Sequence, residues 1–311
     1  MKKALVLGAS GGIGYAIVCE LAARGIQVVA FARGKEKLQA LYEKNEAVSI
    51  FPGDALNEEE LMRASDGIDV IFHALSFPYQ EWEDKHMRCI NTMINVAQAN
   101  QAKIALVDNI YAYGRQSSKV VSEETNKKPH TKKGKIRLAM ENKLKASNVP
   151  SVIVHMPDLY GPNAENTILF ETLKSVTRDK NANFVGSLQV SREFLYTFDG
   201  AKVIVELALQ SDAYNQNWNV PAVHPITGQQ LVELIRDISG YNKQVRTVSK
   251  GMIRTLAIFS PFMREMKEMM YLTEEPVILS GAKYEKEMGV LPHTSYREGL
   301  QETLEWLKKR G

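Results

Sequence analysis

A glycine-rich turn near the amino terminus holds the residues whose spacing points most clearly to chemistry. Gly8, Gly11 and Gly14 follow one another at intervals of three, between an apolar run and a helical pattern. In such a turn one glycine allows the tight bend, one lets the backbone approach a pyrophosphate, and one lets the helix pack against the strand. Free N–H groups and the positive helix end then hold the anion. The turn predicts a dinucleotide site, with incidental glycines as the alternative. The contacts expected here are Gly8, Ser10, Gly11, Gly12, Ile13 and Gly14.

The end of the second predicted strand discriminates between the two nicotinamide cofactors. A carboxylate at this point would bind the adenosine ribose of NAD, but the chain carries Arg33 there and no acid. Arg33 can pair with the 2′-phosphate of NADP, so we expect NADP to be preferred over NAD. A solvated surface arginine is the alternative. After the third strand, Asp54, followed by Ala55, is suited either to bond the adenine amino group or to cap the next loop.

The candidate cofactor residues can lie together only if the fold brings the ends of several strands together. The pattern of the first half of the chain predicts such a fold. Short apolar runs alternate with helical patterns, as in a parallel sheet with helices on both faces. The predicted strands are 3–7, 27–32, 47–51, 69–75, 103–107 and 151–155, and the predicted helices are 12–24, 35–44, 58–64, 82–100 and 135–147. The expected fold class is therefore α/β, a doubly wound Rossmann-like parallel sheet.

The second half is less regular and predicts a smaller, mostly helical substrate domain. Helical patterns cover 168–177, 198–209, 229–239 and 294–310, with a short strand at 218–220. The segment 252–271 is rich in Met, Phe and Leu. It is interpreted as a helical flap over a cleft, with core packing, a dimer contact or membrane-surface binding as alternatives.

The composition excludes several classes of protein. The 311 residues include 39 Lys and Arg against 36 Asp and Glu, a net charge of +3, so nothing steers the chain strongly toward nucleic acid or membrane. Hydrophobic residues make up 44% and charged residues 24%, as in ordinary globular proteins. Cys19 and Cys89 are the two cysteines, too few for a disulfide framework or a multi-thiolate zinc site. We therefore expect a cytoplasmic protein that binds no metal and no membrane.

Further motifs are distributed along most of the chain. They are Gly53-Asp54, His73-Ala74-Leu75, Asn91-Thr92, Tyr113-Gly114, Tyr160-Gly161-Pro162 and the segment 192–201. With the glycine turn, they make the chain resemble the short-chain dehydrogenase/reductase superfamily, in its extended epimerase and dehydratase branch. The resemblance implies a Rossmann NAD(P)-binding domain at 1–157 and 198–224, and a substrate domain at 158–197 and 225–311. It also implies an active site in the cleft between them, with His73, Ala74 and Leu75 near the cofactor.

The positions that resemble the catalytic site depart from the family pattern. The family uses a tyrosine as general acid/base, a lysine four residues later and a nearby serine or threonine. Here Lys133 stands at the tyrosine position, Arg137 at the lysine position and Asn109 at the serine position. Asp158 stands where many members carry an asparagine that contacts the nucleotide sugar. The resemblance therefore implies an atypical subgroup with a degenerate Tyr-x-x-x-Lys site.

Other residues are candidates for the missing chemistry. Arg137 can hold the cofactor ribose or phosphates but cannot shuttle a proton, because its pKa stays above about 12. Lys133 can donate a proton if it is desolvated beside Arg137, and Asn109 can donate a hydrogen bond to a carbonyl oxygen. Tyr111 is a candidate acid, as are Tyr113 and His130, although packing is the alternative for each.

The substrate side is predicted from the resemblance and from charge. The resemblance implies substrate contacts at Asp158, Tyr160 and Arg192, the last to a phosphate; an ion pair of Arg192 with Glu193 or Asp199 is the alternative. The segment 127–137 contains six Lys and Arg. It is interpreted as a solvated loop, a phosphate-binding loop or, least favoured, a nucleic-acid patch, because no aromatic residues interleave it.

Two functions follow from these observations. The first is an NAD(P)-dependent oxidoreductase or epimerase/dehydratase-like enzyme that acts on a carbonyl or alcohol group of a small molecule, possibly a nucleotide sugar. The second is a non-catalytic NADP(H)-binding sensor or regulator, which the altered Tyr-x-x-x-Lys positions favour. A homodimer through the long helix at 82–100 is an open possibility for either.

Overall fold

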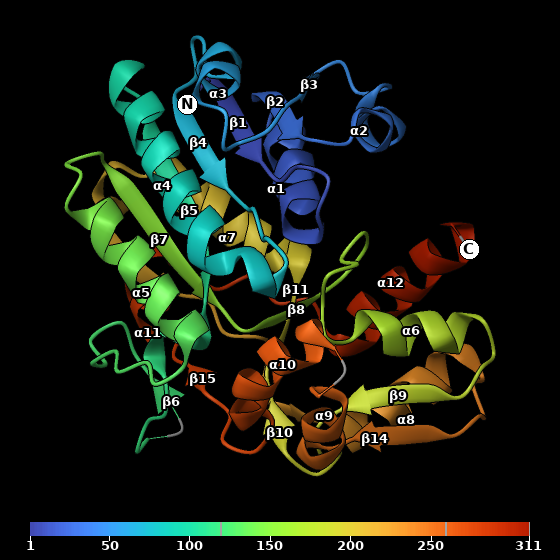
Figure 1. Ribbon diagram of the computed structural model, residues 1–311. Helices are drawn as coiled ribbons and strands as arrows, with labels where there is room; N and C mark the ends of the chain where they lie inside the picture. The colour runs from blue at the N-terminus through green and yellow to red at the C-terminus, as the bar shows by residue number, and fades with distance from the viewer. Residues whose placement is uncertain (119, 259, 311) are drawn as a thin grey trace.

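Seven parallel strands form the central sheet of the computed structural model, which describes residues 1–118, 120–258 and 260–310 (Figure 1). The order across the sheet is β12-β7-β5-β4-β1-β2-β3, and each neighbouring pair is parallel. The strands are β1 (Lys3–Leu7), β2 (Gln27–Ala32), β3 (Val48–Pro52), β4 (Val70–His73), β5 (Lys103–Asn109), β7 (Ser151–Met156) and β12 (Gln216–Asn219). Strand order runs outward from β1 in both directions, so the predicted doubly wound Rossmann-like fold is confirmed.

Helices bury both faces of this sheet (Figure 1). Along β1, Ala4 and Val6 belong to one hydrophobic cluster and Leu5 and Leu7 to another, because successive side chains of a strand point to opposite faces. One face packs against α1 (Gly12–Ala23), α2 (Lys35–Tyr42) and α7 (Thr197–Leu209); the other packs against α3 (Glu58–Ala64), α4 (Trp82–Ala99) and α5 (Lys132–Lys145). Burial on both faces explains why the strands read as continuous apolar runs rather than as alternating patterns.

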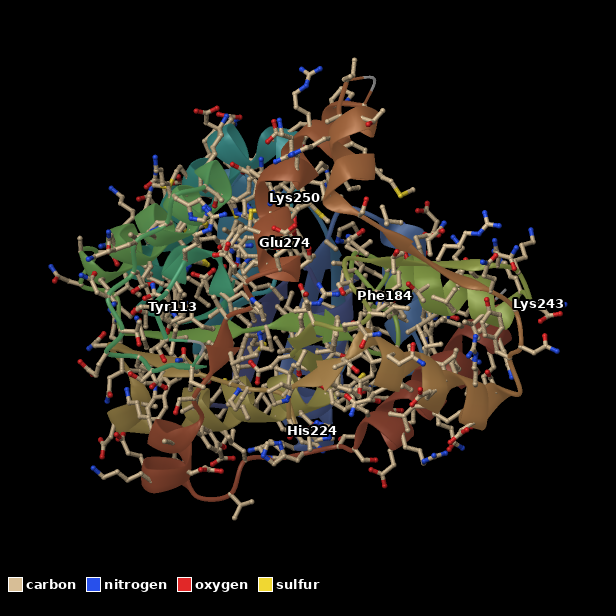
Figure 2. The ribbon with its side chains drawn as sticks, turned by 90° about the horizontal axis from the view of Figure 1, so that it is seen from below. Tyr113, Phe184, His224, Lys243, Lys250 and Glu274 are labelled. Carbon is tan, nitrogen blue, oxygen red and sulfur yellow. The ribbon has the colours of Figure 1, made fainter. Side chains whose placement is uncertain are left out.

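The rest of the chain forms a smaller part that is mostly helical. Figure 2 shows Phe184 and Lys243 of this part on the opposite side of the molecule from Tyr113. Its strands form two-stranded pairs: β8 (Asp158–Tyr160) with β11 (Phe194–Tyr196), β9 (Ala182–Val185) with β14 (Val245–Val248), and β10 (Ser191–Arg192) with β13 (Ile226–Thr227). A further pair, β15 (Ile278–Leu279) with β6 (Val120–Val121), lies apart from these, below α5 in Figure 1. Its helices are α6 (Phe170–Thr177), α8 (Gly228–Ser239), α9 (Lys250–Leu256), α10 (Pro261–Lys267), α11 (Ala282–Met288) and α12 (Tyr296–Arg310).

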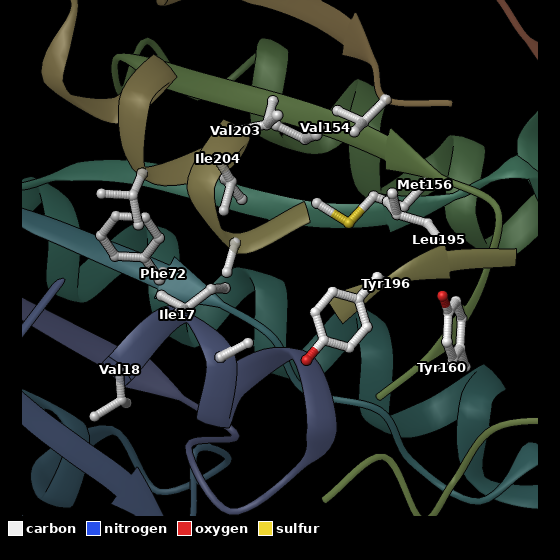
Figure 3. Packing of buried hydrophobic residues seen from close by; sticks show 14 of the residues in the cluster. Ile17, Val18, Phe72, Val154, Met156, Tyr160, Leu195, Tyr196, Val203 and Ile204 are labelled. Carbon is white, nitrogen blue, oxygen red and sulfur yellow. The ribbon is translucent and has the colours of Figure 1, made fainter. Parts of the chain in front are cut away.

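The core beneath α1 and α7 is shown in Figure 3. Ile17 of α1, Phe72 of β4 and Ile204 of α7 are fully buried there. Burial of a large apolar side chain stabilises a fold by about 1.5–3 kcal/mol. Because α7 and β12 come from the second half of the chain, this packing ties both halves to one sheet. The predicted division at 1–157 with 198–224 is compatible with this placement and stays a prediction.

Most predicted elements agree with the structure to within about two residues, but two differ in a way that matters for the site. Helix α5 begins at Lys132 rather than at residue 135, because the hydroxyl of Thr131 caps it by accepting a hydrogen bond from the Gly134 N–H. Strand β4 ends at His73 rather than at residue 75. Lys133 therefore lies in the first turn of a helix.

Within the described residues, no helix has the length and apolarity to cross a membrane.

A buried ionic network joins α5 to β7 and to the chain before it. The Lys127 ammonium, whose side chain is only 8% exposed, lies 2.5 Å from Glu141 Oε2 and 2.8 Å from His155 Nε2. Glu141 also binds Lys145 Nζ at 2.7 Å. Asp108, Glu141 and His155 come close enough together to resemble a set of metal ligands, but the Lys127 ammonium already provides the positive charge between Glu141 and His155. The network is therefore a structural ion cluster.

Replacement of Lys127 by methionine is expected to destabilise the fold. The change keeps most of the length of the side chain but leaves Glu141 with one fewer cation and His155 without its Nε2 partner. Loss of one partner from a buried ion pair typically costs about 3–5 kcal/mol, and Lys145 should reduce that cost. Chemical denaturation checks this, with exposed Lys128→Met as the matched control; equal stability of the two variants would contradict it.

The pH dependence of stability should report on His155. Burial, and then the charge of Lys127, lowers the pKa of His155 to about 4. Because its pKa in the unfolded chain is about 6.5, the stability it contributes is complete above that pH and is lost as the pH falls toward 4. A His155→Asn variant should lose stability less steeply over this range, by about 1.4 kcal/mol per pH unit. Denaturation at pH 7, 6 and 5 measures both slopes, and parallel profiles would argue against the buried neutral histidine.

Candidate functional site

The glycine turn between β1 and α1 has the backbone geometry of an anion cradle. Gly8 has φ +83°, and a Cβ there would lie 2.7 Å from the Ala74 carbonyl oxygen. A Cβ on Gly14 would overlap the carbonyl oxygen of Gly8, so both positions require glycine. The N-cap of α1 is Gly11, which offers no side-chain cap, and the first helical turn holds no acid. The helix N-terminus therefore keeps N–H groups for a ligand, which fits a dinucleotide pyrophosphate.

A second segment covers this turn, and sequence reasoning missed it. A Cβ on Gly12 would lie 2.6 Å from Ala164 Cα, and Asn163 Nδ2 donates to the Ser10 carbonyl oxygen at 3.1 Å. Asn163 is buried in a left-handed conformation, φ 60°, and its Oδ1 has no hydrogen-bond partner. An unsatisfied buried amide oxygen beside the cradle is a further feature that a bound ligand can satisfy.

The residues predicted on the adenosine side differ in their surroundings. Arg33 follows β2, is exposed, and forms no salt bridge within the described part of the chain, so it is free to meet a phosphate. Asp54 Oδ1 accepts a hydrogen bond from the Leu56 N–H at 3.0 Å, while its own N–H donates to Glu60 Oε2 at 2.7 Å. The structure therefore shows the loop-capping role that was the alternative for Asp54. Ala55 is buried behind it.

The His73-Ala74-Leu75 motif lies where the end of β4 meets the glycine turn. The His73 ring is fully buried, with Nε2 3.8 Å from the Cys89 thiol and Nδ1 without a hydrogen-bond partner. Burial, and then the charge of Arg137, lowers the pKa of His73 to about 3. His73 is therefore neutral at physiological pH. Ala74 makes the close backbone approach to Gly8, which places the motif beside the cradle as expected.

Lys133 is buried against the C-terminal helices. It is fully buried, and its ammonium forms salt bridges with Glu265 of α10 and, at 3.0 Å, with Glu268 at the start of the 3-10 helix η4 (Glu268–Thr273). Glu268 also accepts hydrogen bonds from the N–H groups of Lys132 and Lys133. The segment predicted as a helical flap forms α9 (Lys250–Leu256), α10 (Pro261–Lys267) and η4, which we call the flap; its role as a cover over a cleft stays a prediction. Two of its carboxylates hold the Lys133 side chain.

Arg137 lies one helical turn after Lys133 and is only partly satisfied. Its guanidinium carbon is 4.7 Å from the centre of the Trp82 ring, and Nε is 3.6 Å from Asp108 Oδ1, too far for a hydrogen bond. Nε and Nη1 of Arg137, Oδ2 of Asp108 and both ring nitrogens of His86 are buried without hydrogen-bond partners. Such a concentration of unsatisfied buried polar atoms is a feature that a bound ligand or water can satisfy.

Asn109, the last residue of β5, and Tyr111, two residues later, lie in the same region. Asn109 Oδ1 accepts a hydrogen bond from the Tyr111 N–H at 3.0 Å, which leaves its amide nitrogen available as a donor. The Tyr111 hydroxyl lies 3.0 Å from the Tyr79 hydroxyl. Burial, then the neighbouring Tyr79 and Asp158, holds the pKa of Tyr111 well above its usual range. Tyr111 is therefore a neutral phenol, not an ionised base.

The predicted substrate residues separate into two groups. Arg192 is buried, with Nη1 3.8 Å from Asp158 Oδ2 and Nη2 donating to the Val185 carbonyl oxygen at 3.0 Å. Its ionic partner is thus Asp158, not Glu193 or Asp199. Burial raises the pKa of Asp158. Tyr160 is buried between the rings of Tyr196 and Tyr296 (Figure 3 shows the first), which favours packing; its substrate role stays a prediction.

The six cations of segment 127–137 do not form one loop with a common role. Lys127, Lys133 and Arg137 are each drawn inward to carboxylates, as described above. Lys132 is exposed and pairs with Glu83 at 2.5 Å, while Lys128 and Lys135 are exposed. Because helix α5 begins at Lys132, the segment is partly helical. The interpretation of this segment as a solvated loop is therefore wrong.

Comparisons with known proteins agree with this geometry. A protein of Sinorhizobium fredii described as uncharacterized is 23% identical over 99% of this chain and 95% of its own length. A 2-alkyl-3-oxoalkanoate reductase of Shewanella oneidensis is 42% identical, but over only 24% of this chain and 19% of its own. The UDP-glucuronic acid 4-epimerase of Bacillus cereus, solved in complex with NAD, superposes with TM-score 0.79 at 18% identity over 99% of both chains.

The match to a family model is the most direct of these findings. The model for NAD(P)H-binding proteins matches residues 8–193, which begin at the first glycine of the cradle and end within the segment that returns to α7. That match covers more than half of the chain. The chain therefore belongs to the NAD(P)H-binding family, and its fold is that of the UDP-glucuronic acid 4-epimerase structure.

Proposed function

We propose that this protein is an NADP-preferring oxidoreductase of the epimerase/dehydratase type, acting on a carbonyl or alcohol group of a small molecule. The observation that carries the proposal is the buried guanidinium of Arg137, with two nitrogen atoms that lack hydrogen-bond partners. It lies at the carboxyl edge of a doubly wound sheet, where such folds bind their ligands. The named activities of the reductase and epimerase relatives agree with this class of chemistry.

The chain offers a consistent set of groups for the cofactor. The N–H groups at the start of α1 would hold the pyrophosphate, and Arg33 would hold the 2′-phosphate. Arg137 would bond the ribose or a phosphate, because its N–H groups are the buried donors nearest to the degenerate site. When bound, the nicotinamide supplies or accepts the hydride, which is the chemistry that the side chains of this chain lack.

Lys133 and the residues around it would bind the substrate oxygen and exchange a proton with it. The Asn109 amide nitrogen can donate a hydrogen bond to a carbonyl oxygen. The Lys133 ammonium, or the neutral phenol of Tyr111, can give that oxygen a proton when hydride arrives at the carbon. In the opposite direction the same group takes the proton back. Asp158 and Arg192 would contact the remainder of the substrate.

A specific observation favours the second candidate, a non-catalytic sensor of NADP(H). The Lys133 ammonium is closed off by Glu265 and Glu268, and burial raises the pKa values of both Tyr79 and Tyr111. A protein that binds the dinucleotide and moves its flap would need no proton donor. The two candidates share the cofactor site and differ in turnover.

Fluorescence titration with NADPH and NADH tests the cofactor assignment. We expect tighter binding of NADPH, and we expect Arg33→Ala to weaken NADPH binding about 10-fold or more, since a hydrogen bond to a charged group is worth about 1.5–3 kcal/mol. NADH binding should change little. Lys35→Ala, which removes an exposed cation two residues away, is the control. A chain that binds NADH more tightly than NADPH would overturn the role given to Arg33.

Turnover on a panel of carbonyl compounds, followed by nicotinamide absorbance, separates the enzyme from the sensor. For the enzyme, Lys133→Met should lower kcat at least 100-fold, the order of a lost general acid, with little change in cofactor Kd. Arg137→Met should weaken cofactor binding itself. Lys132→Met, on the same helical turn but exposed, is the matched control. Tight NADPH binding without turnover by the unmodified chain, and no effect of Lys133→Met, would establish the sensor instead.

A further inference from the structure

A cationic hollow lies beside the flap. Its volume is about 290 Å³, and four of its lining side chains are basic: Arg115, Lys250, Arg254 and Lys267. They come from three separate regions, the loop after the Tyr113-Gly114 motif, α9 and α10. His130, Thr131 and Tyr271 line the rest, and Glu268 is the acidic residue in the lining. Positive charges from separate elements thus meet around one small space.

The carboxylates nearby compensate only part of this charge. Arg115 Nε lies 2.9 Å from Glu275 Oε2, and Lys250 Nζ lies 2.6 Å from Glu274 Oε2; Figure 2 shows Lys250 and Glu274 together at the flap. Arg254 and Lys267 form no ion pair with any described residue. The Glu268 carboxylate is occupied by Lys133 and by two backbone N–H groups. Two cations in the lining therefore remain uncompensated.

Tyr271 provides a second, independent sign of a ligand. Its side chain is buried, 3% exposed, and its hydroxyl has no hydrogen-bond partner. The ring lies between the His130 ring, 4.5 Å away between centres, and the Arg115 guanidinium, 5.6 Å from the ring centre. Burial of a hydroxyl without a partner is unfavourable. Because Tyr271 lines the hollow, a ligand oxygen that reaches the hydroxyl would satisfy it and would also meet the free cations.

We propose that this hollow binds a phosphate or carboxylate group, a site separate from the dinucleotide cradle. Arg254 and Lys267 supply the charge, and the Tyr271 hydroxyl donates to an anionic oxygen. The group has two sources with the same chemistry: the anionic end of the substrate or a free anion. The first source, the substrate, rests on the proposed function. Glu268 lines the hollow and also contacts Lys133 at 3.0 Å, so a single side chain lies between the hollow and the site at Lys133.

Titration with inorganic phosphate at constant ionic strength tests the site. We expect saturable binding by calorimetry, weakened at least 10-fold in Arg254→Gln/Lys267→Gln and about 3-fold in Tyr271→Phe. Lys308→Gln/Lys309→Gln, which removes two exposed cations from α12, is the matched control and should bind as the unmodified chain does. Phosphate bound at the glycine turn would be insensitive to the hollow variants. Absence of saturable binding, or equal binding by the hollow and control variants, would overturn the proposal.

Two further measurements are needed. One distinguishes failure of the anion site from failure of the proposed function, and the other distinguishes the two sources of the anion. NADPH titration of Arg254→Gln/Lys267→Gln should give an unchanged Kd, so that loss of phosphate binding and loss of cofactor binding are distinct results. Dihydroxyacetone phosphate and dihydroxyacetone are then compared in the presence of NADPH. If dihydroxyacetone phosphate binds at least 10-fold more tightly than inorganic phosphate, the hollow serves the substrate. Equal affinity of the two phosphates identifies a free-anion site.

Discussion

The close approach of backbone to backbone at the glycine turn is the constraint on which the rest of the site depends. Gly14 at the start of α1 lies against the carbonyl of Gly8, and Gly8 lies against Ala74 after β4. These contacts fix the N-terminus of α1 at the carboxyl edge of the sheet. The ends of β2, β3, β4 and β5 reach the same edge because the strands are parallel. The parallel strand ends at this edge therefore determine where each group that could bind the cofactor lies.

Much of this frame was predictable from the sequence, because its signals are local. The apolar runs, the glycine spacing and the Asn57 cap, which accepts from the Glu59 and Glu60 N–H groups, depend on a few adjacent residues. The start of α5 was placed too late because Lys132, Lys133 and Gly134 carry no helical periodicity; the Thr131 cap determines it. The cover over the glycine turn by Asn163 and Ala164 joins residues about 150 positions apart, and no local pattern encodes such a contact.

The positions of Lys133 and Arg137 could be taken from the sequence, but their surroundings could not. Lys133 was expected to donate a proton if it is desolvated beside Arg137. The structure buries it and pairs it with Glu265 and Glu268, while Arg137 lies near Asp108. The partners of Lys133 come from the flap, more than 130 residues away. Both cations thus have acidic partners. The two carboxylates hold the Lys133 ammonium in place as a hydrogen-bond donor.

Glu268 connects the site to the hollow on the flap, and this determines how the two can influence each other. Its carboxylate accepts from the first N–H groups of α5, where the helix dipole favours negative charge, and also pairs with Lys133. An anion bound beside Arg254 and Lys267 would place a second negative charge near the same carboxylate. Arg254 and Lys267 are exposed, so water and the basic side chains of the hollow screen much of the repulsion between that anion and Glu268. Glu268 is thus the side chain that the site at Lys133 and the hollow have in common.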